Sequence, residues 1–227
     1  MVSRQSKTSS SGSENQAGFS RTDEHGGEEK RRRRAKKSRP LDETSLRDLA
    51  LSYVARFSTT GAKLEAYLAR KLRERGVVED EDGRTRELDV TGIVTRMIEL
   101  GYVDDDAYAR AKTRDLTARG YGARRVEQAL WAAGVEDNVR EDNRPSEAQA
   151  RQAAVLLATK RRFGPYARSS IAGEEEEHTL DPKRREKQVA AMLRAGHLYD
   201  HAGKIIDARS IEEVEDWLAE VQEDDGF

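Results

Sequence analysis

Over most of the chain, apolar residues recur at steps of three and four, which is the spacing of one face of an α-helix. The first apolar stripe consists of Leu46, Leu49, Ala50, Tyr53, Val54 and Phe57. The second consists of Leu64, Tyr67, Leu68, Ala69 and Leu72, and the third of Val90, Ile93, Val94, Met97, Ile98 and Leu100. Asp42, Thr44 or Ser45 can cap the first helix, and Gly76 and Gly101 can end the second and third. No segment alternates apolar and polar residues long enough to indicate a strand, so the pattern predicts an all-α fold.

The helical pattern repeats within the chain. Residues 97–107 return 95 positions later as residues 192–202: in both, an apolar helix ends at glycine, an aromatic ring and a branched apolar residue follow, and an acid can cap the next helix. A second echo relates residues 119–123 to residues 161–165, where an aromatic residue and a glycine lie between two helices. These echoes predict related helical units that stack on one another, because one such unit can hardly bury its own apolar face.

We place the units at residues 41–103, 104–143 and 144–209. An acidic insert near residues 173–182 interrupts the third unit. Residues 210–227 form an acidic C-terminal helix and tail, with an apolar stripe of Ile211, Val214, Trp217, Leu218 and Val221. That stripe predicts either a helix that covers the last unit, as terminal caps of repeat arrays do, or an amphipathic segment that binds a partner.

Charge is strongly segregated along the chain, although the net charge is only −2. Residues 1–40 hold 11 Lys and Arg against 5 Asp and Glu, whereas residues 211–227 hold 8 acids and no base. Residues 1–40 have almost no apolar residues, so we expect a disordered arm. Its basic cluster consists of Arg31, Arg32, Arg33, Arg34, Lys36 and Lys37. This arm either neutralises phosphates or only keeps the chain in solution, and the asymmetry favours a nucleic-acid or acidic partner.

Little in the sequence supports catalysis. There is no cysteine, no phosphate-binding loop and no nucleophile elbow, and Arg125 stands where a dinucleotide fingerprint after Gly120 would need its third glycine. His197 and His201 have a metal-ligand spacing but no evident third ligand, which favours packing histidines. No apolar run is long enough to span a membrane, and no signal-peptide core is present. We therefore expect a cytoplasmic protein without enzymatic activity, cofactor or metal.

Basic residues gather at the helix–helix corners. They are Arg110, Arg114, Arg119, Arg124 and Arg125 in the second unit and Lys160, Arg161 and Arg162 in the third. Arg124 and Arg125 fall in the first turn of a helix, where cations oppose the helix dipole, and this favours an anionic partner. If the units stack, these corners can line one basic track beside Tyr121 and Phe163. The alternative is a solvated surface balanced by neighbouring acids.

Two motifs resemble the RecX family, whose members regulate the bacterial recombinase RecA. They are Gly101-Tyr102-Val103-Asp104-Asp105 with Tyr108-Ala109, and Arg119-Gly120-Tyr121-Gly122-Ala123-Arg124-Arg125-Val126 with Leu130 and Gly134-Val135. The resemblance covers about residues 44–143 well and residues 146–209 more weakly. It implies an elongated crescent of tandem three-helix repeats, with Tyr102, Val103, Tyr108, Val126 and Leu130 in the core.

The resemblance also implies a function. Members of the family lie in the groove of the RecA–single-stranded DNA filament and limit its growth, ATP hydrolysis, strand exchange and co-protease activity. Arg114, Arg119, Arg124 and Arg125 match basic positions that face the filament. We expect a monomer that binds RecA filaments and single-stranded DNA, with weaker binding to duplex DNA. Two other functions stay open: a stand-alone, sequence-independent DNA-binding module, and a helical-repeat scaffold for another protein.

Overall fold

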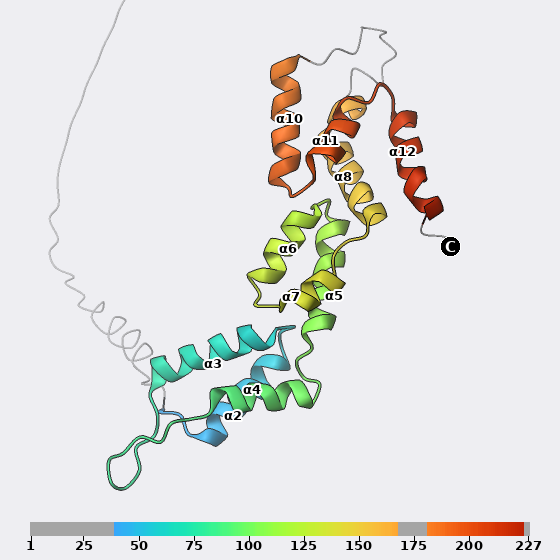
Figure 1. The fold of residues 1–227 in the computed structure, drawn as a ribbon. Helices are drawn as coiled ribbons and strands as arrows, with labels where there is room; N and C mark the ends of the chain where they lie inside the picture. Colours follow the sequence, from blue (N-terminus) through green and yellow to red (C-terminus); the bar gives the residue numbers. More distant parts are fainter. Residues whose placement is uncertain (1–38, 168–180, 225–227) are drawn as a thin grey trace, which may run out of the picture. The chain divides into compact units, whose positions relative to one another are not determined.

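The computed structural model describes residues 39–167 and 181–224, and its helices are shown in Figure 1. The chain divides into two compact units, residues 1–39 and 40–227, and every helix discussed below lies in the second. The predicted basic arm and nearly all of the predicted acidic insert lie outside the described residues. Within the described part, the structure is helical, with two isolated β-bridges and no strand, so the prediction of an all-α fold is confirmed.

The first three helices enclose one apolar core. They are α2 (Glu43–Val54), α3 (Gly61–Arg75) and α4 (Val90–Glu99). The buried side chains between them are Leu41, Leu46, Ala50, Leu64, Leu68, Ile93, Val94, Met97 and Val103. These are mostly members of the three apolar stripes, so the helical spacing in the sequence places the right faces inward.

Side-chain caps fix where the first helices begin. The side chains of Asp42, Thr60 and Asp89 accept backbone N–H groups at the starts of α2, α3 and α4. The assignment of Phe57 to the first helical stripe is wrong, because α2 ends at Val54 and the chain then extends to bring Thr60 into its capping position. Phe57 is exposed to solvent.

A second core is enclosed by α5 (Asp105–Ala118), α6 (Ala123–Trp131) and α7 (Asp137–Asp142). Its buried side chains are Ala109, Leu116, Val126, Leu130, Ala133 and Val135. Hydrogen bonds join this core to the first, among them one from the Gly61 N–H to the Asp105 carboxylate (2.9 Å). Thr60 donates its hydroxyl proton to the carbonyl of Ala133 (2.5 Å), and the Lys63 ammonium donates to the Tyr108 hydroxyl (2.6 Å).

A third core lies between α8 (Glu147–Arg161), α10 (Pro182–Arg194), α11 (Tyr199–Ile206) and α12 (Ile211–Asp224), with a 3₁₀ turn at Gly164–Tyr166. Three-helix groups therefore recur along the chain, as the sequence echoes predict, and α12 is an addition to the last group. Among the described residues, no helix is both long enough and apolar enough to cross a lipid bilayer.

Helix α12 covers the third core, which decides between the two interpretations of its apolar stripe. Val214 and Trp217 are buried. The Arg151 guanidinium lies 4.5 Å from the centre of the Trp217 ring and donates to the Trp217 carbonyl (2.6 Å), while the His201 ring meets the indole edge-on. Since Trp217 faces inward, the scaffold hypothesis loses the exposed surface on which it depended.

The same turn ends α4, α5, α6, α8 and α10, and it is the structural basis of the sequence echoes. A residue in the left-handed conformation follows the helix, and the next backbone N–H returns to a carbonyl of the last turn, as from Tyr102 to Met97 (2.9 Å) and from His197 to Met192 (3.1 Å). Glycine takes the left-handed position in every case except at the end of α8, where Arg162 has φ 57°.

The residues assigned to the core by resemblance divide into three groups. Val103, Val126 and Leu130 are fully buried, and Tyr108 is half-buried against the second core. Tyr102 is 56% exposed, so its placement in the core is wrong. The turn after α4 directs Val103 inward in its place, and Tyr102 lines a groove between α2 and α4.

Candidate nucleic-acid and protein interface

The N-terminal end of α6 docks on the C-terminal end of α10 (Figure 1). The Gly122 N–H donates to the Ala195 carbonyl (3.0 Å), and the Arg124 N–H donates to the Gly196 carbonyl (3.1 Å). N–H groups at the start of α6, which have no carbonyl to bond within their own helix, thus donate to carbonyls that follow the last residue of α10. This docking holds the side chains of Arg124 and Arg125 at the surface, where both are exposed.

The docked helix ends change the electrostatic argument for an anionic partner. Arg124 and Arg125 do lie in the first turn of α6, which contains no acid. The partial negative charge at the end of α10 offsets the positive end of α6, so these cations are destabilised less than the sequence alone suggests. The case for a binding surface here depends instead on exposure: Arg125 bonds only Gln128 (2.9 Å), and the Arg124 side chain has no partner among the described residues.

A second basic group lies at the turn between α5 and α6. Arg119 pairs with Asp115 (3.3 Å) at the surface, and its guanidinium lies 5.6 Å from the centre of the Tyr121 ring. Lys160 on α8 reaches the Arg119 carbonyl (3.4 Å), which brings the second and third units together at this turn. Tyr121 is half-buried and packs against both the second and the third core. Its main role is therefore to join those cores.

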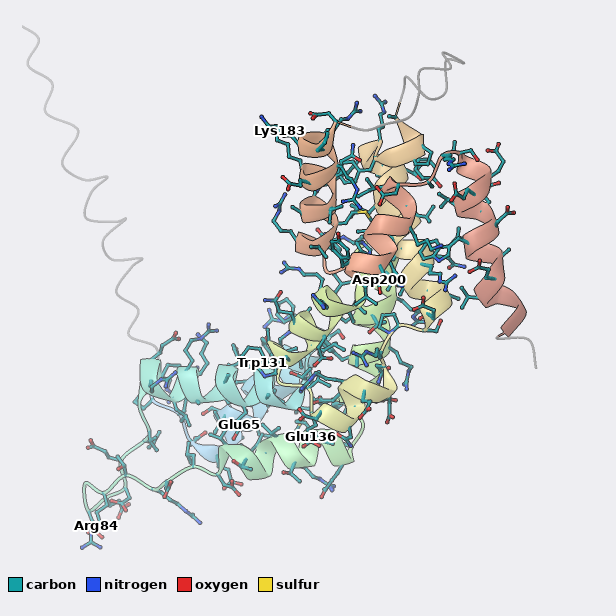
Figure 2. The ribbon with its side chains drawn as sticks, turned by 45° about the horizontal axis from the view of Figure 1, so that its top comes forward. Glu65, Arg84, Trp131, Glu136, Lys183 and Asp200 are labelled. Atoms are coloured by element: carbon teal, nitrogen blue, oxygen red, sulfur yellow. The ribbon has the colours of Figure 1, made fainter. Side chains whose placement is uncertain are left out.

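We call the exposed cations of the α5–α6 turn, of the first turn of α6 and of the C-terminal end of α8 the basic corner. It consists of Arg119, Arg124, Arg125, Lys160, Arg161 and Arg162, all exposed. Phe163, which the sequence analysis places beside the basic track, is half-buried against the third core. Trp131, at the other end of α6, is 68% exposed (Figure 2).

Arg110 and Arg114 lie near a depression that no residue of the basic corner lines. They lie on α5 where it faces the start of α8, in a depression that also contains Arg144. Arg110 pairs with Asp106 one turn earlier, whereas the Arg114 side chain has no ion pair among the described residues. The single basic track stays a prediction. Arg110 and Arg114 line a depression that we call, together with the one adjoining it along α8, the α5–α8 groove.

The two histidines are packing residues. His197 is 2% exposed and donates its Nε2–H to the Gly120 carbonyl (3.0 Å), which ties the third unit to the turn before α6. His201 bonds the Glu147 carboxylate (3.0 Å) next to Trp217. No group of side chains suited to hold a metal occurs among the described residues.

Burial of His197 predicts a pH-dependent stability. Desolvation lowers the pKa of His197 below its usual value of about 6.5, so the unfolded chain binds the proton more readily. The free energy of unfolding is therefore greatest above that value and falls as the pH is lowered from 7.5 to 5.5. Urea unfolding followed by circular dichroism measures this dependence.

The matched variant is His197→Gln, whose amide nitrogen takes the place of Nε2 and can still donate to the Gly120 carbonyl but does not titrate. We expect this variant to be less stable at pH 7.5 and to lose less stability on acidification. Because the two proteins differ only at residue 197, the contributions of all other groups cancel in the comparison. An unchanged pH slope in the variant would show that another group controls the dependence.

Sequence reasoning missed three residues of the α5–α8 groove: Arg144, Gln149 and Gln152. Arg144 follows Glu141 and Asp142 in the sequence, so it looks like part of a charge-balanced loop. Its position in the groove is set by Asn143, whose carbonyl accepts the Thr113 hydroxyl (3.1 Å). That contact joins residues 30 positions apart, and no local pattern signals it.

Taken together, the three-helix cores, the docked helix ends and the exposed corner arginines define a helical-repeat protein with exposed basic side chains at its helix ends. Comparison with known proteins identifies the family. The family model described as "RecX, second three-helix domain" matches residues 104–142. The chain is 30% identical over 187 residues to the regulatory protein RecX of Myxococcus xanthus, covering 81% of this chain and 95% of that protein. It is also 30% identical to the regulatory protein RecX of Agrobacterium fabrum, over 77% of this chain and 88% of that relative.

The crystal structure of RecX from Lactobacillus salivarius has the same fold, with a TM-score of 0.53 and 22% identity over 72% of this chain and 94% of that one. This chain therefore belongs to the RecX family of regulatory proteins.

Proposed function

We propose that this chain regulates the RecA recombinase by binding the RecA–single-stranded DNA filament. In this proposal it limits filament growth and depresses ATP hydrolysis, strand exchange and co-protease activity, and it does so without catalytic chemistry of its own. The observation that carries the proposal is the likeness to a RecX regulatory protein over 95% of that relative's length. The protein would act as a monomer in the cytoplasm, where the filament forms.

The basic corner supports this proposal. A nucleoprotein filament is a polyanion, and exposed cations steer proteins towards such partners and fix their orientation. Arg124 and Arg125 are held at the surface by a helix docked at its backbone, so they are preorganised for contact. The arm cations Arg31, Arg32, Arg33, Arg34, Lys36 and Lys37 would add sequence-independent affinity for DNA.

The proposal is tested by the single-stranded-DNA-dependent ATPase activity of RecA, measured with increasing amounts of the full chain. We expect ATP hydrolysis to fall as the chain approaches stoichiometry with RecA. Repeating the titration with excess single-stranded DNA separates filament binding from simple removal of DNA, because removal is relieved by the excess.

Two results would contradict the proposal. An ATPase rate that does not change with the chain at stoichiometric amounts would exclude regulation of RecA filaments. If such a chain still bound DNA, with a steep loss of affinity in salt, it would be a stand-alone DNA-binding module.

A further inference from the structure

A polar groove runs between α5 and the start of α8, outside the basic corner. It consists of two adjoining depressions, of about 330 and 380 Å³, which share Arg114, Thr117 and Gln149. The first extends to Arg110 on α5 and to the residues before α8, and the second continues along α8 to Leu156. We call the two together the α5–α8 groove.

The walls of the groove are fixed at both ends. At one end, the Thr113 hydroxyl bonds the Asn143 carbonyl (3.1 Å), and the Asn143 amide bonds Asp106 and the Val139 carbonyl (both 2.8 Å). At the other end, Gly120 lies against the α8 backbone, where an added Cβ would come within 3.3 Å of the Leu157 nitrogen. The groove is therefore a preformed feature of the packed second and third units.

The charge of the groove is positive. Its lining contains three arginines and one acid, Asp142. Arg110 is neutralised by Asp106, but the side chains of Arg114 and Arg144 make no ion pair with the described residues. Glu147, the acid in the first turn of α8, bonds Arg151 and His201 and does not line the groove. Two guanidinium groups without an ion pair among the described residues therefore face one groove, against the single carboxylate of Asp142.

The other lining side chains suit an extended phosphate backbone. Gln149 and Gln152 supply amide donors beside the arginines, whereas the Thr117 hydroxyl donates to the Thr113 carbonyl (2.9 Å). Phosphate and sugar oxygens accept hydrogen bonds from these side-chain types. The lining contains no aromatic residue on which a base could stack, so contacts here would be independent of base sequence.

We propose that the α5–α8 groove binds the sugar–phosphate backbone of single-stranded DNA, with Arg114 and Arg144 as its main phosphate contacts. This inference deepens the proposed function and rests on it for its biological setting. It assigns the DNA contact of the folded part of the chain to this groove and adds Arg144, Gln149 and Gln152 to the interface.

The experiment measures binding of the full chain to a fluorescent oligo(dT) of 30 nucleotides by anisotropy, without RecA and at several salt concentrations. The test variant is Arg114→Ala/Arg144→Ala. Each lost phosphate contact should lower the slope of log K against log salt by about 0.7, so we expect a slope smaller by about 1.4 and affinity reduced about tenfold near 0.1 M salt. Arg184→Ala/Lys187→Ala removes the same charge from exposed positions of α10 and should leave affinity nearly unchanged.

A second variant, Gln152→Glu, places a carboxylate in the groove without removing any hydrogen bond among the described residues, and it should also weaken binding. If Arg114→Ala/Arg144→Ala binds oligo(dT) like the wild type, or no more weakly than the α10 control, the groove proposal is overturned. Because RecA is absent, that failure is distinguishable from failure of the proposed function, which would appear as unchanged RecA ATPase activity with the wild-type chain. If Arg114→Ala/Arg144→Ala lost as much affinity for duplex DNA as for oligo(dT), the assignment of the groove to single strands would be overturned.

Discussion

Replacing Arg119, Arg124 and Arg125 together with alanine is expected to raise the concentration needed for half-inhibition of RecA ATPase activity about tenfold or more. Arginine anchors at protein interfaces each contribute roughly 1 kcal/mol or more, and these three belong to the basic corner. Helical content and melting temperature should be nearly unchanged. The side chains are exposed, and the only ion pair lost among the described residues, between Arg119 and Asp115, is a surface pair worth little.

The matched control is Lys183→Ala/Arg184→Ala/Lys187→Ala, which removes three exposed cations from α10, where Figure 2 marks Lys183 near its start. This control should inhibit RecA like the wild type. Equal inhibition by the corner variant and the wild type would show that the filament contacts lie elsewhere, whereas an equal loss in both variants would indicate an effect of net charge alone.

The substitution Gly196→Ala is expected to reduce the free energy of unfolding by about 2–5 kcal/mol. Gly196 has φ +93°, and an added Cβ would lie 2.4 Å from the Arg125 nitrogen. Left-handed backbone costs a residue with a side chain about 1–2 kcal/mol, and crowding a packed contact costs about 1–3 kcal/mol more. Relief of the clash requires α6 to separate from α10, with loss of the two hydrogen bonds that join them.

Two other glycines separate these contributions. Gly101 has φ +72° with no atom near the position of a Cβ, so Gly101→Ala should cost only the conformational part, about 1–2 kcal/mol. Gly203 is helical and has ordinary space around it, so Gly203→Ala should stabilise by about 0.5–1 kcal/mol. Urea unfolding compares all three. If Gly196→Ala costs no more than Gly101→Ala, the docked helix ends are not a tight junction.

Local signals account for most of the fold that the sequence predicts. Side-chain caps and the glycine turns act within a few residues, so Asp42, Asp89 and Gly101 are recognisable in the sequence as helix boundaries. Local sequence does not determine the exposure of Tyr102, because that exposure depends on whether Tyr102 or its neighbour Val103 packs against the other helices. A repeat motif gives no means of choosing between two adjacent apolar side chains.

The binding surface is less predictable than the fold. Sequence spacing identifies the arginines but not the depression between α5 and α8, which Arg110 and Arg114 line together with Arg144. The Gly196 carbonyl, just after α10, accepts the Arg124 N–H although it lies 72 positions further along the chain. Its effect on the α6 dipole therefore has no sequence signature. Long-range contacts of this kind arise only in the folded chain.

The account is tested most directly by adding the full chain to preformed RecA filaments on fluorescent single-stranded DNA and measuring the RecA that remains bound over time. We predict that filaments stop growing and lose RecA progressively when the chain is present, and that the Arg119→Ala/Arg124→Ala/Arg125→Ala variant has a much weaker effect. Filaments that keep the same length and the same lifetime with and without the wild-type chain would contradict the account.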